Sequence, residues 1–319
     1  MSFQAYSPGV VDCNSDVDLA NVKGRTVIVT GGAKGMGEDG VRAFVAAGAF
    51  VTFGDTDTVS GEKLARELGV NANFVRCDVT SWEDQLAMFK SAEAGSSKKA
   101  IDIVVANAGI SGPDEAFNIE DEHVLNEVIT SAIDSDEPSK PLLKILHIDL
   151  IGVIYTLKLA RHYFMKHPLD AHHDRCFIMN GSLVGFLDVP GIPQYMASKW
   201  GCRALMRCVR RTTIVDGVRI NLTGPWYVGT TILSPAVQEY CKSKNIVFAE
   251  SADAAAAWLR IASNPNINGR SFAIVPREIA SSGYFDIGKD DYDEGDLFNE
   301  LQDILLRTSH RLQVKASDQ

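Results

Sequence analysis

The stretch TVIVTGGAKGMG, residues 26–37, joins a short apolar run to a turn that contains four glycines. Glycines let the backbone approach a pyrophosphate closely, and the helix expected next would attract its charge to the positive N-terminal end. A tight connection without any ligand is the alternative explanation of this turn alone. The stretch predicts a strand, a dinucleotide-binding turn and a helix. The turn residues expected to contact the dinucleotide are Gly31, Lys34, Gly35, Met36 and Gly37.

Short β-rich runs alternate with helix-length segments from about Lys23 to Pro276. This alternation predicts one α/β domain with a doubly wound parallel sheet. The expected strands are 26–30, 50–54, 73–77, 101–106, 176–180, 218–222 and 271–275. The expected organisation is an N-terminal extension at 1–22, a dinucleotide-binding and catalytic domain at 23–277 with an acidic insertion at 113–141, and a C-terminal extension with a helix at 278–319.

The composition excludes several classes of protein. The chain has 319 residues and a formal net charge of -10, which opposes nonspecific binding to nucleic acids and anionic membranes. No run approaches the roughly 20 apolar residues of a membrane span, and the N-terminus lacks the features of a secretory signal. The six cysteines form no Cys-x-x-Cys pair, which fits reduced thiols. We therefore expect a soluble, cytoplasmic protein.

Two charged residues near the glycine turn favour different nicotinamide cofactors. Asp55 ends the second expected strand, 18 residues after Gly37, where a carboxylate can bind the adenosine ribose and repel a 2′-phosphate. Lys34 could attract that phosphate, but a carboxylate at the ribose acts at shorter range. The sequence therefore predicts NAD, with NADP as the weaker alternative. Asp78 and Val79 follow the third strand, where Asp78 would meet the adenine amino group or else cap a turn.

A Tyr-x-x-x-Lys pair places both side chains on one face of a helix, where the ammonium favours the phenolate. The chain contains this spacing twice, at Tyr195 with Lys199 and at Tyr240 with Lys244. Ser182 lies 13 residues before Tyr195, just after the fifth expected strand, at the sheet edge where doubly wound folds bind ligands. The first pair is therefore the predicted reacting pair, and the second is expected on the surface.

Together these motifs resemble the short-chain dehydrogenase/reductase family over residues 24–275. The matching positions are Thr30, Gly31, Gly35, Gly37, Asp78, Asn107, Ala108, Gly109, Ser182, Tyr195, Lys199, Asn221, Pro225, Val228 and Thr230. Within the family the chain resembles the 15-hydroxyprostaglandin dehydrogenase-like branch and fungal dehydrogenases of secondary metabolism. The resemblance implies a single Rossmann-like domain, a seven-stranded parallel sheet in the order 3-2-1-4-5-6-7, and a homodimer or homotetramer.

The resemblance also implies a role for each matching residue. Tyr195 would be the general acid/base, Lys199 would favour its phenolate and hold the nicotinamide ribose, and Ser182 would orient the substrate oxygen. A phenol is otherwise a poor base at neutral pH, so the neighbouring cation is required. The cofactor residues implied beyond the turn are Asp55, Asp78, Val79, Asn107, Ala108, Gly109, Tyr195, Lys199, Pro225, Val228 and Thr230.

Asp149 stands where members of the family usually carry an Asn, which helps to hold a water beside the lysine. It shares a helix side with Ile145 and Val153, so we expect it to be at least partly buried, with Lys199 as its partner directly or through water. A carboxylate there would compete for the lysine's charge and move the optimum of alcohol oxidation to higher pH. A proton relay, an ordinary buried hydrogen bond and weakened catalysis are the alternatives for this candidate catalytic residue.

Trp226 is a second departure, because most members of the family have Gly after the preceding Pro225. Its indole could form a wall of the substrate cavity or pack beneath the loop. With Phe186, Leu187 and the apolar loop 232–248, it predicts a cavity for a lipophilic, ring-bearing alcohol or ketone. We therefore expect an NAD-dependent oxidoreductase that acts on a secondary alcohol or ketone of secondary metabolism.

Other functions fit parts of the sequence. An NADPH-dependent ketoreductase would use the same residues, whereas a non-redox cyclase or a nucleotide sensor would retain the cofactor fold without hydride transfer. His167, His172 and His173 have the composition of a metal cluster, but they precede the fifth strand, at the edge opposite the chemistry. The acidic run 290–296 does not open a calcium loop with both a Gly at the sixth and a Glu at the twelfth place. No metal is therefore predicted.

Overall fold

The computed structural model describes residues 9–112, 114, 140–166 and 174–309. Its strands form one sheet in the order β3-β2-β1-β4-β5-β6-β7-β8. The strands are β1 (Thr26–Thr30), β2 (Phe50–Asp55), β3 (Ala72–Arg76), β4 (Ile103–Ala106), β5 (Arg175–Asn180), β6 (Val218–Pro225), β7 (Ser271–Ile274) and β8 (Tyr284–Asp286). The helices are α1 (Gly35–Ala46), α2 (Thr58–Leu68), α3 (Trp82–Gly95), α5 (Lys144–Leu146), α6 (Gly152–Met165), α7 (Pro193–Val209), α8 (Pro235–Ser243), α9 (Ser251–Ser263) and α10 (Leu297–Thr308).

The doubly wound fold predicted from the sequence is confirmed. The seven expected strands are present, pair in parallel and follow the expected order. The sheet of the described residues also has an eighth strand, so the prediction of seven was wrong in number. Strand β8 is three residues long and runs antiparallel to β7, with Tyr284 opposite Ile274. Three residues are too few for a recognisable strand pattern, which is why β8 was missed.

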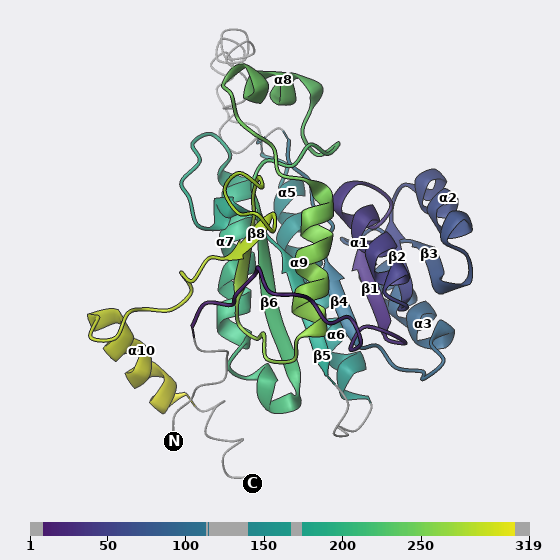
Figure 1. Ribbon diagram of the computed structural model, residues 1–319, viewed down its shortest axis with the longest axis horizontal. Coiled ribbons are helices and arrows are strands. Elements are labelled where there is room, and N and C mark those ends of the chain that lie inside the picture. Colours follow the sequence, from purple (N-terminus) through teal and green to yellow (C-terminus); the bar gives the residue numbers. More distant parts are fainter. Residues whose placement is uncertain (1–8, 113, 115–139, 167–173, 310–319) are drawn as a thin grey trace.

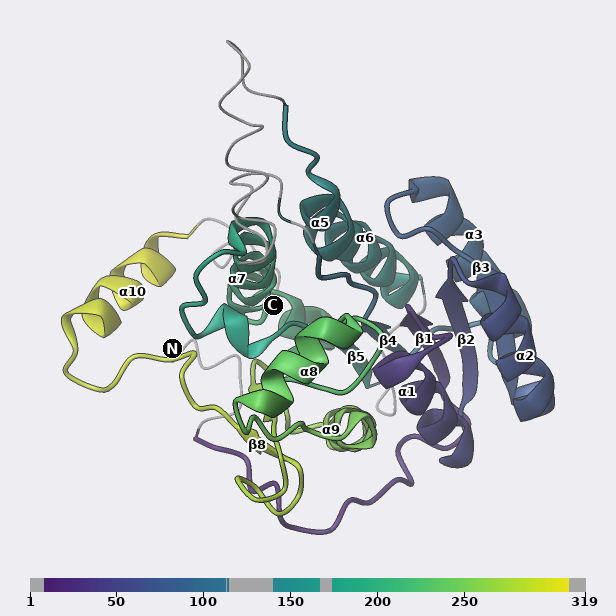
Figure 2. The same ribbon diagram turned by 90° about the horizontal axis from the view of Figure 1, so that it is seen from above.

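Helices cover both faces of the sheet, as the two views in Figures 1 and 2 show. On one face α1 and α9 bury Phe44 and Trp258 against the strands. On the other face α3, α6 and α7 bury Phe89, Phe164 and Met206. Strand β1 is buried along its whole length, as burial on both faces of a parallel sheet requires. The apolar strands therefore lie between two hydrophobic cores, one on each face of the sheet.

The parallel arrangement brings the carboxyl ends of the central strands to one edge of the sheet. The glycine turn follows β1 there, Asp55 ends β2, and Asn107 follows β4.

The helical segment expected at 142–165 consists of α5, a π-helical turn at His147–Ile151 and α6. π-Helical turns inside longer helices are common at functional sites.

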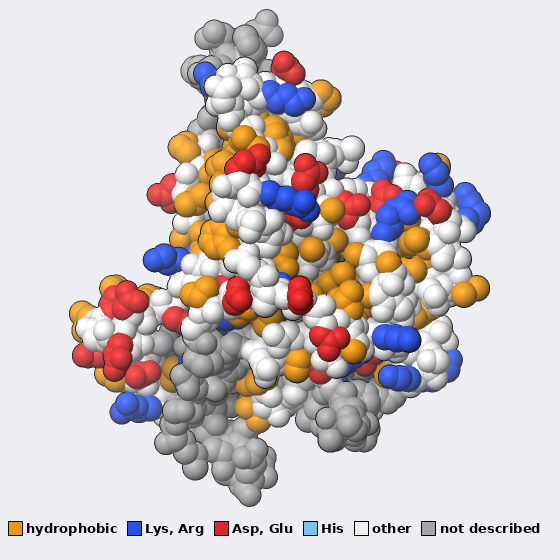
Figure 3. Space-filling view, viewed as in Figure 1, with side chains coloured by type: hydrophobic (Ala, Val, Ile, Leu, Met, Phe, Trp, Pro, Cys, Tyr) orange, Lys and Arg blue, Asp and Glu red, His pale blue; other side chains and the backbone are white. Residues whose placement is uncertain are grey.

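The segment after β7 is attached to the domain by buried ion pairs. Arg270, the residue before β7, pairs with Asp286 on β8 at 2.7 Å, and the Val11 N–H donates to the same carboxylate at 2.9 Å. Arg210, at the end of α7, pairs with Asp291 at 2.7 Å. Helix α10 is the helix expected in this extension, and none of its residues is buried. Its apolar side chains lie beside acidic ones at the lower left of Figure 3.

Gly40 on α1 provides a test of the packing between α1 and α9. A Cβ at Gly40 would overlap the ring of Trp258, which is completely buried and has no room to move. Overpacking costs about 1–3 kcal/mol, more than the ~0.8–1 kcal/mol that alanine gains in helix propensity. Gly40→Ala should therefore lower the free energy of unfolding in urea. Gly229→Ala is the control, because its Cβ would lie 4.0 Å from Phe248, and equal stability of both variants would contradict this packing.

Candidate functional site

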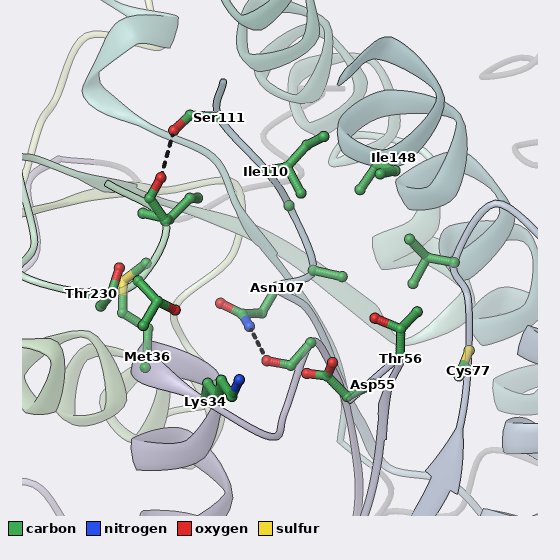
Figure 4. Close-up of a pocket in the computed structure, with 18 of the residues that line it drawn as sticks. Lys34, Met36, Asp55, Thr56, Cys77, Asn107, Ile110, Ser111, Ile148 and Thr230 are labelled. Atoms are coloured by element: carbon green, nitrogen blue, oxygen red, sulfur yellow. Dashed lines mark hydrogen bonds between the residues drawn. The ribbon is translucent and has the colours of Figure 1, made fainter. Parts of the chain in front are cut away.

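A cleft of about 370 Å³ lies at the carboxyl edge of the sheet. Its walls come from the loops after β1, β2, β3, β4 and β6. Figure 4 shows Lys34 and Asp55 near one end, and Ile110 and Ser111 further along. The predicted cofactor residues that line this cleft are Gly31, Lys34, Gly35, Met36, Gly37, Asp55, Asp78, Val79, Asn107, Ala108, Gly109 and Thr230. The structure thus brings together residues from five separate loops.

The glycine turn leaves space that side chains would fill. Gly31 has φ +63°, and a Cβ there would lie 2.7 Å from Ala108 Cα. A Cβ at Gly37 would overlap the carbonyl oxygen of Gly31 and lie 2.7 Å from Asn107 Nδ2. Only glycine therefore permits both the backbone conformation and the close approach of the two loops. This shape fits the pyrophosphate of a dinucleotide at the start of α1.

A chain of buried hydrogen bonds supports the turn from below. Asn107 Nδ2 donates to the Gly31 carbonyl at 2.9 Å, and its Oδ1 accepts from Asn180 Nδ2 at 2.9 Å. Asn180 Oδ1 accepts from the Thr223 hydroxyl at 2.9 Å, which in turn accepts from the Trp258 indole N–H at 3.0 Å. Sequence analysis missed Asn180 and Thr223 as support for the site. Asn180 has a signal in the sequence, because it is the polar last residue of β5 after an apolar run, whereas Thr223 lies inside β6 and has none.

Two carboxylates and one lysine lie at the end of the cleft next to β2. Asp55 is oriented by the backbone, because its Oδ2 accepts the Ala33 N–H and its Oδ1 accepts the Asp57 N–H, both at 3.0 Å. Lys34 Nζ pairs with Asp57 Oδ2 at 2.5 Å. The lysine expected beside the turn is therefore present, but its charge is opposed by a carboxylate that sequence analysis did not consider.

Asp78 caps a turn, which was one of the two roles weighed for it from the sequence. Its Oδ1 accepts hydrogen bonds from the Thr80 N–H at 2.9 Å and from the Thr80 hydroxyl at 2.8 Å, so it caps the turn after β3. It also lines the cleft, together with Val79. The capping bonds use one carboxylate oxygen, which leaves a contact with adenine as a prediction.

The reacting residues predicted from the sequence lie on two elements at the same sheet edge. Tyr195 and Lys199 are one turn apart on α7, and Lys199 Nζ is 5.1 Å from the centre of the Tyr195 ring. Ser182 lies two residues after the end of β5 and is buried, and its hydroxyl accepts the Val184 N–H at 3.1 Å. The Tyr-x-x-x-Lys spacing therefore places the Lys199 ammonium next to the Tyr195 phenol.

Asp149 is the direct partner of Lys199. Its Oδ2 lies 2.9 Å from Lys199 Nζ, and both side chains are buried, with exposed fractions of 0% and 5%. Its Oδ1 accepts the Ile110 N–H at 2.9 Å, which fixes the loop after β4. Burial by itself lowers the pKa of the Lys199 ammonium, but the charges of Asp149 and Tyr195 raise it above its ordinary value. The lysine is therefore charged at any working pH.

Gly109 connects this ion pair to the cleft. Gly109 lines the cleft, and a Cβ there would lie 3.1 Å from Asp149 Oδ2 and 3.4 Å from Lys199 Nζ. The ammonium therefore lies directly behind the cleft wall.

The start of α7 is also fixed, because Asp114 Oδ2 accepts the N–H of Gln194, the residue before Tyr195, at 2.5 Å. Sequence analysis missed this cap, since Asp114 lies 80 residues away in the chain.

Several predicted residues lie near the site without lining the cleft. Phe186, expected at the substrate, packs under Arg203, whose guanidinium carbon is 4.0 Å from the ring centre. Trp226 is half-buried and packs edge-on against Tyr227, with ring centres 4.9 Å apart. Neither residue forms the wall of the described cleft. The other predicted site residues outside this wall are Asp149, Ser182, Tyr195, Lys199, Pro225 and Val228. Their contact with ligands stays a prediction.

The cleft has further lining residues that sequence analysis did not select. These are Thr56, Cys77, Ile110, Ser111, Ile148, Thr231 and Ile232. The Ser111 hydroxyl donates to the Ile232 carbonyl at 3.0 Å and so joins the loop after β4 to the loop after β6 (Figure 4). Ser111 and Ile232 belong to no sequence motif, because their contact depends on how the loops after β4 and β6 pack together.

Two other possibilities, a metal site and a membrane span, concern the described part of the chain. It contains no group of three or more His, Cys, Asp or Glu side chains arranged to hold a metal ion. His167, His172 and His173 lie outside the described residues, as does most of the acidic insertion. Within the same residues, every helix is too short or too polar to cross a membrane.

The buried ion pair gives a stability prediction. In Lys199→Met the Asp149 carboxylate loses its charged partner, and no other hydrogen-bond donor reaches its Oδ2 among the described residues. Leaving a buried charge unpaired costs about 3–5 kcal/mol, so urea unfolding should show a loss of that order. Adding Asp149→Asn to Lys199→Met removes the charge and should restore much of the stability. If the double variant is less stable than Lys199→Met, the pair does not act as described.

Comparisons with known proteins agree with this geometry. The short chain dehydrogenase family matches residues 25–240. The chain is 39% identical to 5′-hydroxyaverantin dehydrogenase of Dothistroma septosporum, over 92% of this chain and 96% of that protein. It is 30% identical to NADP-dependent dehydrogenase M3 of a Phoma species, over 86% of this chain and 81% of that one. The resemblance to fungal dehydrogenases is thus confirmed, and the 15-hydroxyprostaglandin branch stays a prediction.

A solved structure shares the fold at low sequence identity. The 3-ketoacyl-(acyl-carrier-protein) reductase of Brucella melitensis, complexed with NADH, has a TM-score of 0.65 and 19% identity, covering 79% of this chain and 97% of that one. This likeness concerns the fold alone. The family match spans most of the sheet and both reacting residues of α7. The chain therefore belongs to the short chain dehydrogenase family and is an oxidoreductase.

Proposed function

We propose that the protein transfers a hydride between NAD(H) and a lipophilic, ring-bearing secondary alcohol or ketone. The observation that supports this most is the position of Lys199, whose buried ammonium lies 5.1 Å from the centre of the Tyr195 ring and directly behind Gly109 in the cleft wall. A bound nicotinamide ring supplies or accepts the hydride. The residues of this chain then have to move one proton and hold the substrate oxygen.

Tyr195 is the proposed general acid/base. A phenol holds its proton too tightly to act as a base at neutral pH, and a nearby cation favours its phenolate. Lys199 provides that cation on the same face of α7. In alcohol oxidation Tyr195 takes the hydroxyl proton, and in ketone reduction it returns one, while Ser182 orients the oxygen. Proton transfer by such a positioned group contributes about 10²–10⁴ to the rate.

The charges at the β2 end of the cleft support NAD as the cofactor. Asp55 is oriented by two backbone N–H groups, which leaves its carboxylate in place to accept from the ribose hydroxyls. The only lysine that lines the described cleft, Lys34, is paired with Asp57. A relative that is named NADP-dependent makes NADPH the alternative.

The substrate class rests on the cleft and on the relatives. Ile110, Ile148 and Ile232 give one part of the cleft an apolar lining, which suits a lipophilic ring. The Dothistroma relative, which matches nearly its whole length, is named for 5′-hydroxyaverantin. We therefore propose 5′-hydroxyaverantin, or a secondary metabolite with a similar hydroxyl group, as the substrate class.

Tyr195→Phe tests the function. With 5′-hydroxyaverantin and NAD, turnover followed by the absorbance of reduced nicotinamide should fall by about 10²–10⁴, because the proton acceptor is gone. Binding of NADH, followed by its fluorescence, should be unchanged. Full turnover in the variant would contradict the assignment of Tyr195. Absence of turnover in the unmodified protein with this substrate, with related alcohols and with both cofactors would favour a nucleotide sensor or non-redox cyclase.

Asp149→Asn tests the influence of the ion pair on the reaction. Removing the carboxylate that faces Lys199 at 2.9 Å leaves more of the ammonium's field to act on Tyr195. Alcohol oxidation should keep or raise its turnover, because the ammonium then acts on the phenol without an opposing carboxylate charge. A loss of more than about a hundredfold would instead show that the carboxylate itself carries the proton.

A further inference from the structure

Lys34 and Asp57 form an ion pair that no motif of the sequence indicates. Lys34 belongs to the glycine turn after β1, and Asp57 belongs to the loop between β2 and α2. Their charged atoms are 2.5 Å apart, with exposed side-chain fractions of 52% and 29%. The pair is therefore accessible to solvent and to a ligand in the cleft that Lys34 lines.

Asp57 is held in place independently of the lysine. Its Oδ1 accepts the Ser60 N–H at 3.0 Å, and its Oδ2 accepts the Ser60 hydroxyl at 3.0 Å, so it is the N-cap of α2. Its own N–H donates to Asp55 Oδ1 at 3.0 Å. The hydrogen bonds from Lys34 and Ser60 lower the pKa of Asp57 to about 2. Asp57 is therefore a fixed negative charge, and the flexible lysine is the partner that adjusts its position.

This arrangement bears on how the site distinguishes the two nicotinamide dinucleotides. They differ by a phosphate on the adenosine ribose, which a nearby cation accommodates and a carboxylate repels. Lys34 is the cation beside the turn, but its ammonium is already paired with the Asp57 carboxylate. With Asp55 also present, this end of the cleft carries two negative charges and one positive charge, so a further phosphate is opposed.

We propose that Asp57 is a specificity-determining residue, which excludes a 2′-phosphate by holding Lys34 in an ion pair. This inference rests on the proposed function, because it concerns the cofactor of the same cleft. It differs from the role of Asp55, which would act on the ribose directly. Without the Asp57 charge, Lys34 is free to turn toward the phosphate, and the negative charge at this end falls by one.

The size of the effect follows from the exposure of the pair. Ion pairs open to solvent have interaction energies of up to about 1 kcal/mol, which corresponds to about a fivefold change in an equilibrium constant. A doubly charged phosphate responds both to the loss of the carboxylate and to the release of the lysine. We expect a gain in NADPH affinity of about five- to tenfold at low salt, reduced at high salt by screening.

Asp57→Asn is the appropriate variant, because Asn is as good a helix N-cap as Asp and keeps the acceptor for Ser60. Equilibrium binding of NADH and of NADPH, followed by the fluorescence of the reduced nicotinamide, needs no substrate. The ratio of the two dissociation constants should move toward NADPH in Asp57→Asn, with NADH affinity nearly unchanged. Glu62→Gln is the matched control, because it removes one negative charge from the exposed Glu62–Arg66 pair on the same helix.

A second pair of variants tests the part of Lys34. Lys34→Met alone removes the cation from the cleft wall and leaves the Asp57 charge unpaired, so it is the reference background for the double variant. Lys34→Met combined with Asp57→Asn should lose most of the gain seen in Asp57→Asn. This non-additivity is expected only if the two residues act on the phosphate as a unit.

The outcomes separate this inference from the proposed function. An unchanged NADPH-to-NADH ratio in Asp57→Asn overturns the inference, as does a gain equal to that of Glu62→Gln or one that persists without Lys34. Neither result affects the assignment of Tyr195 or hydride transfer. Failure of the unmodified protein to bind either dinucleotide overturns the proposed function itself. The expected ratio shift, dependent on Lys34 and on salt, supports the inference.

Discussion

The site is organised around the buried ion pair between the Lys199 ammonium and the Asp149 carboxylate. Taking both charges out of water is expensive, so the pair persists only where the surrounding backbone holds it closely. Here α7 supplies the lysine, the π-helical turn before α6 supplies the carboxylate, and the Ile110 N–H after β4 binds its second oxygen. One interaction thus connects α7, the helical segment that continues into α6 and a wall of the cleft.

The cleft has an ion pair at each end, and their surroundings give them different consequences. The pair of Lys199 and Asp149 is almost completely buried, so it contributes to the fold and to the charge beside Tyr195. The pair of Lys34 and Asp57 is exposed, so it adds little to stability. Its effect is on the field that a charged ligand meets. Burial, more than distance, therefore separates a structural ion pair from one that acts on ligand choice.

Most of the fold could be predicted from the sequence, because parallel strands buried on both faces are continuous apolar runs. Strand β1 has the predicted ends, and the others differ by a few residues. Strand β8 could not be predicted, because its pairing depends on β7 and on Asp286, whose partners Arg270 and Val11 are distant in the chain. Phe186 illustrates the same limit at the site, since its ring packs under Arg203 of α7.

The sequence by itself determined the glycine turn and the spacing of Tyr195 and Lys199, because both depend on neighbouring residues along one turn or one helix. It also indicated that Asp149 would be buried beside the lysine. Only the tertiary structure decided that this contact is direct, and that Lys34 is paired with Asp57. The physical reason is that an ion pair between separate elements depends on how their loops meet at the sheet edge, and local spacing contains no information about that meeting.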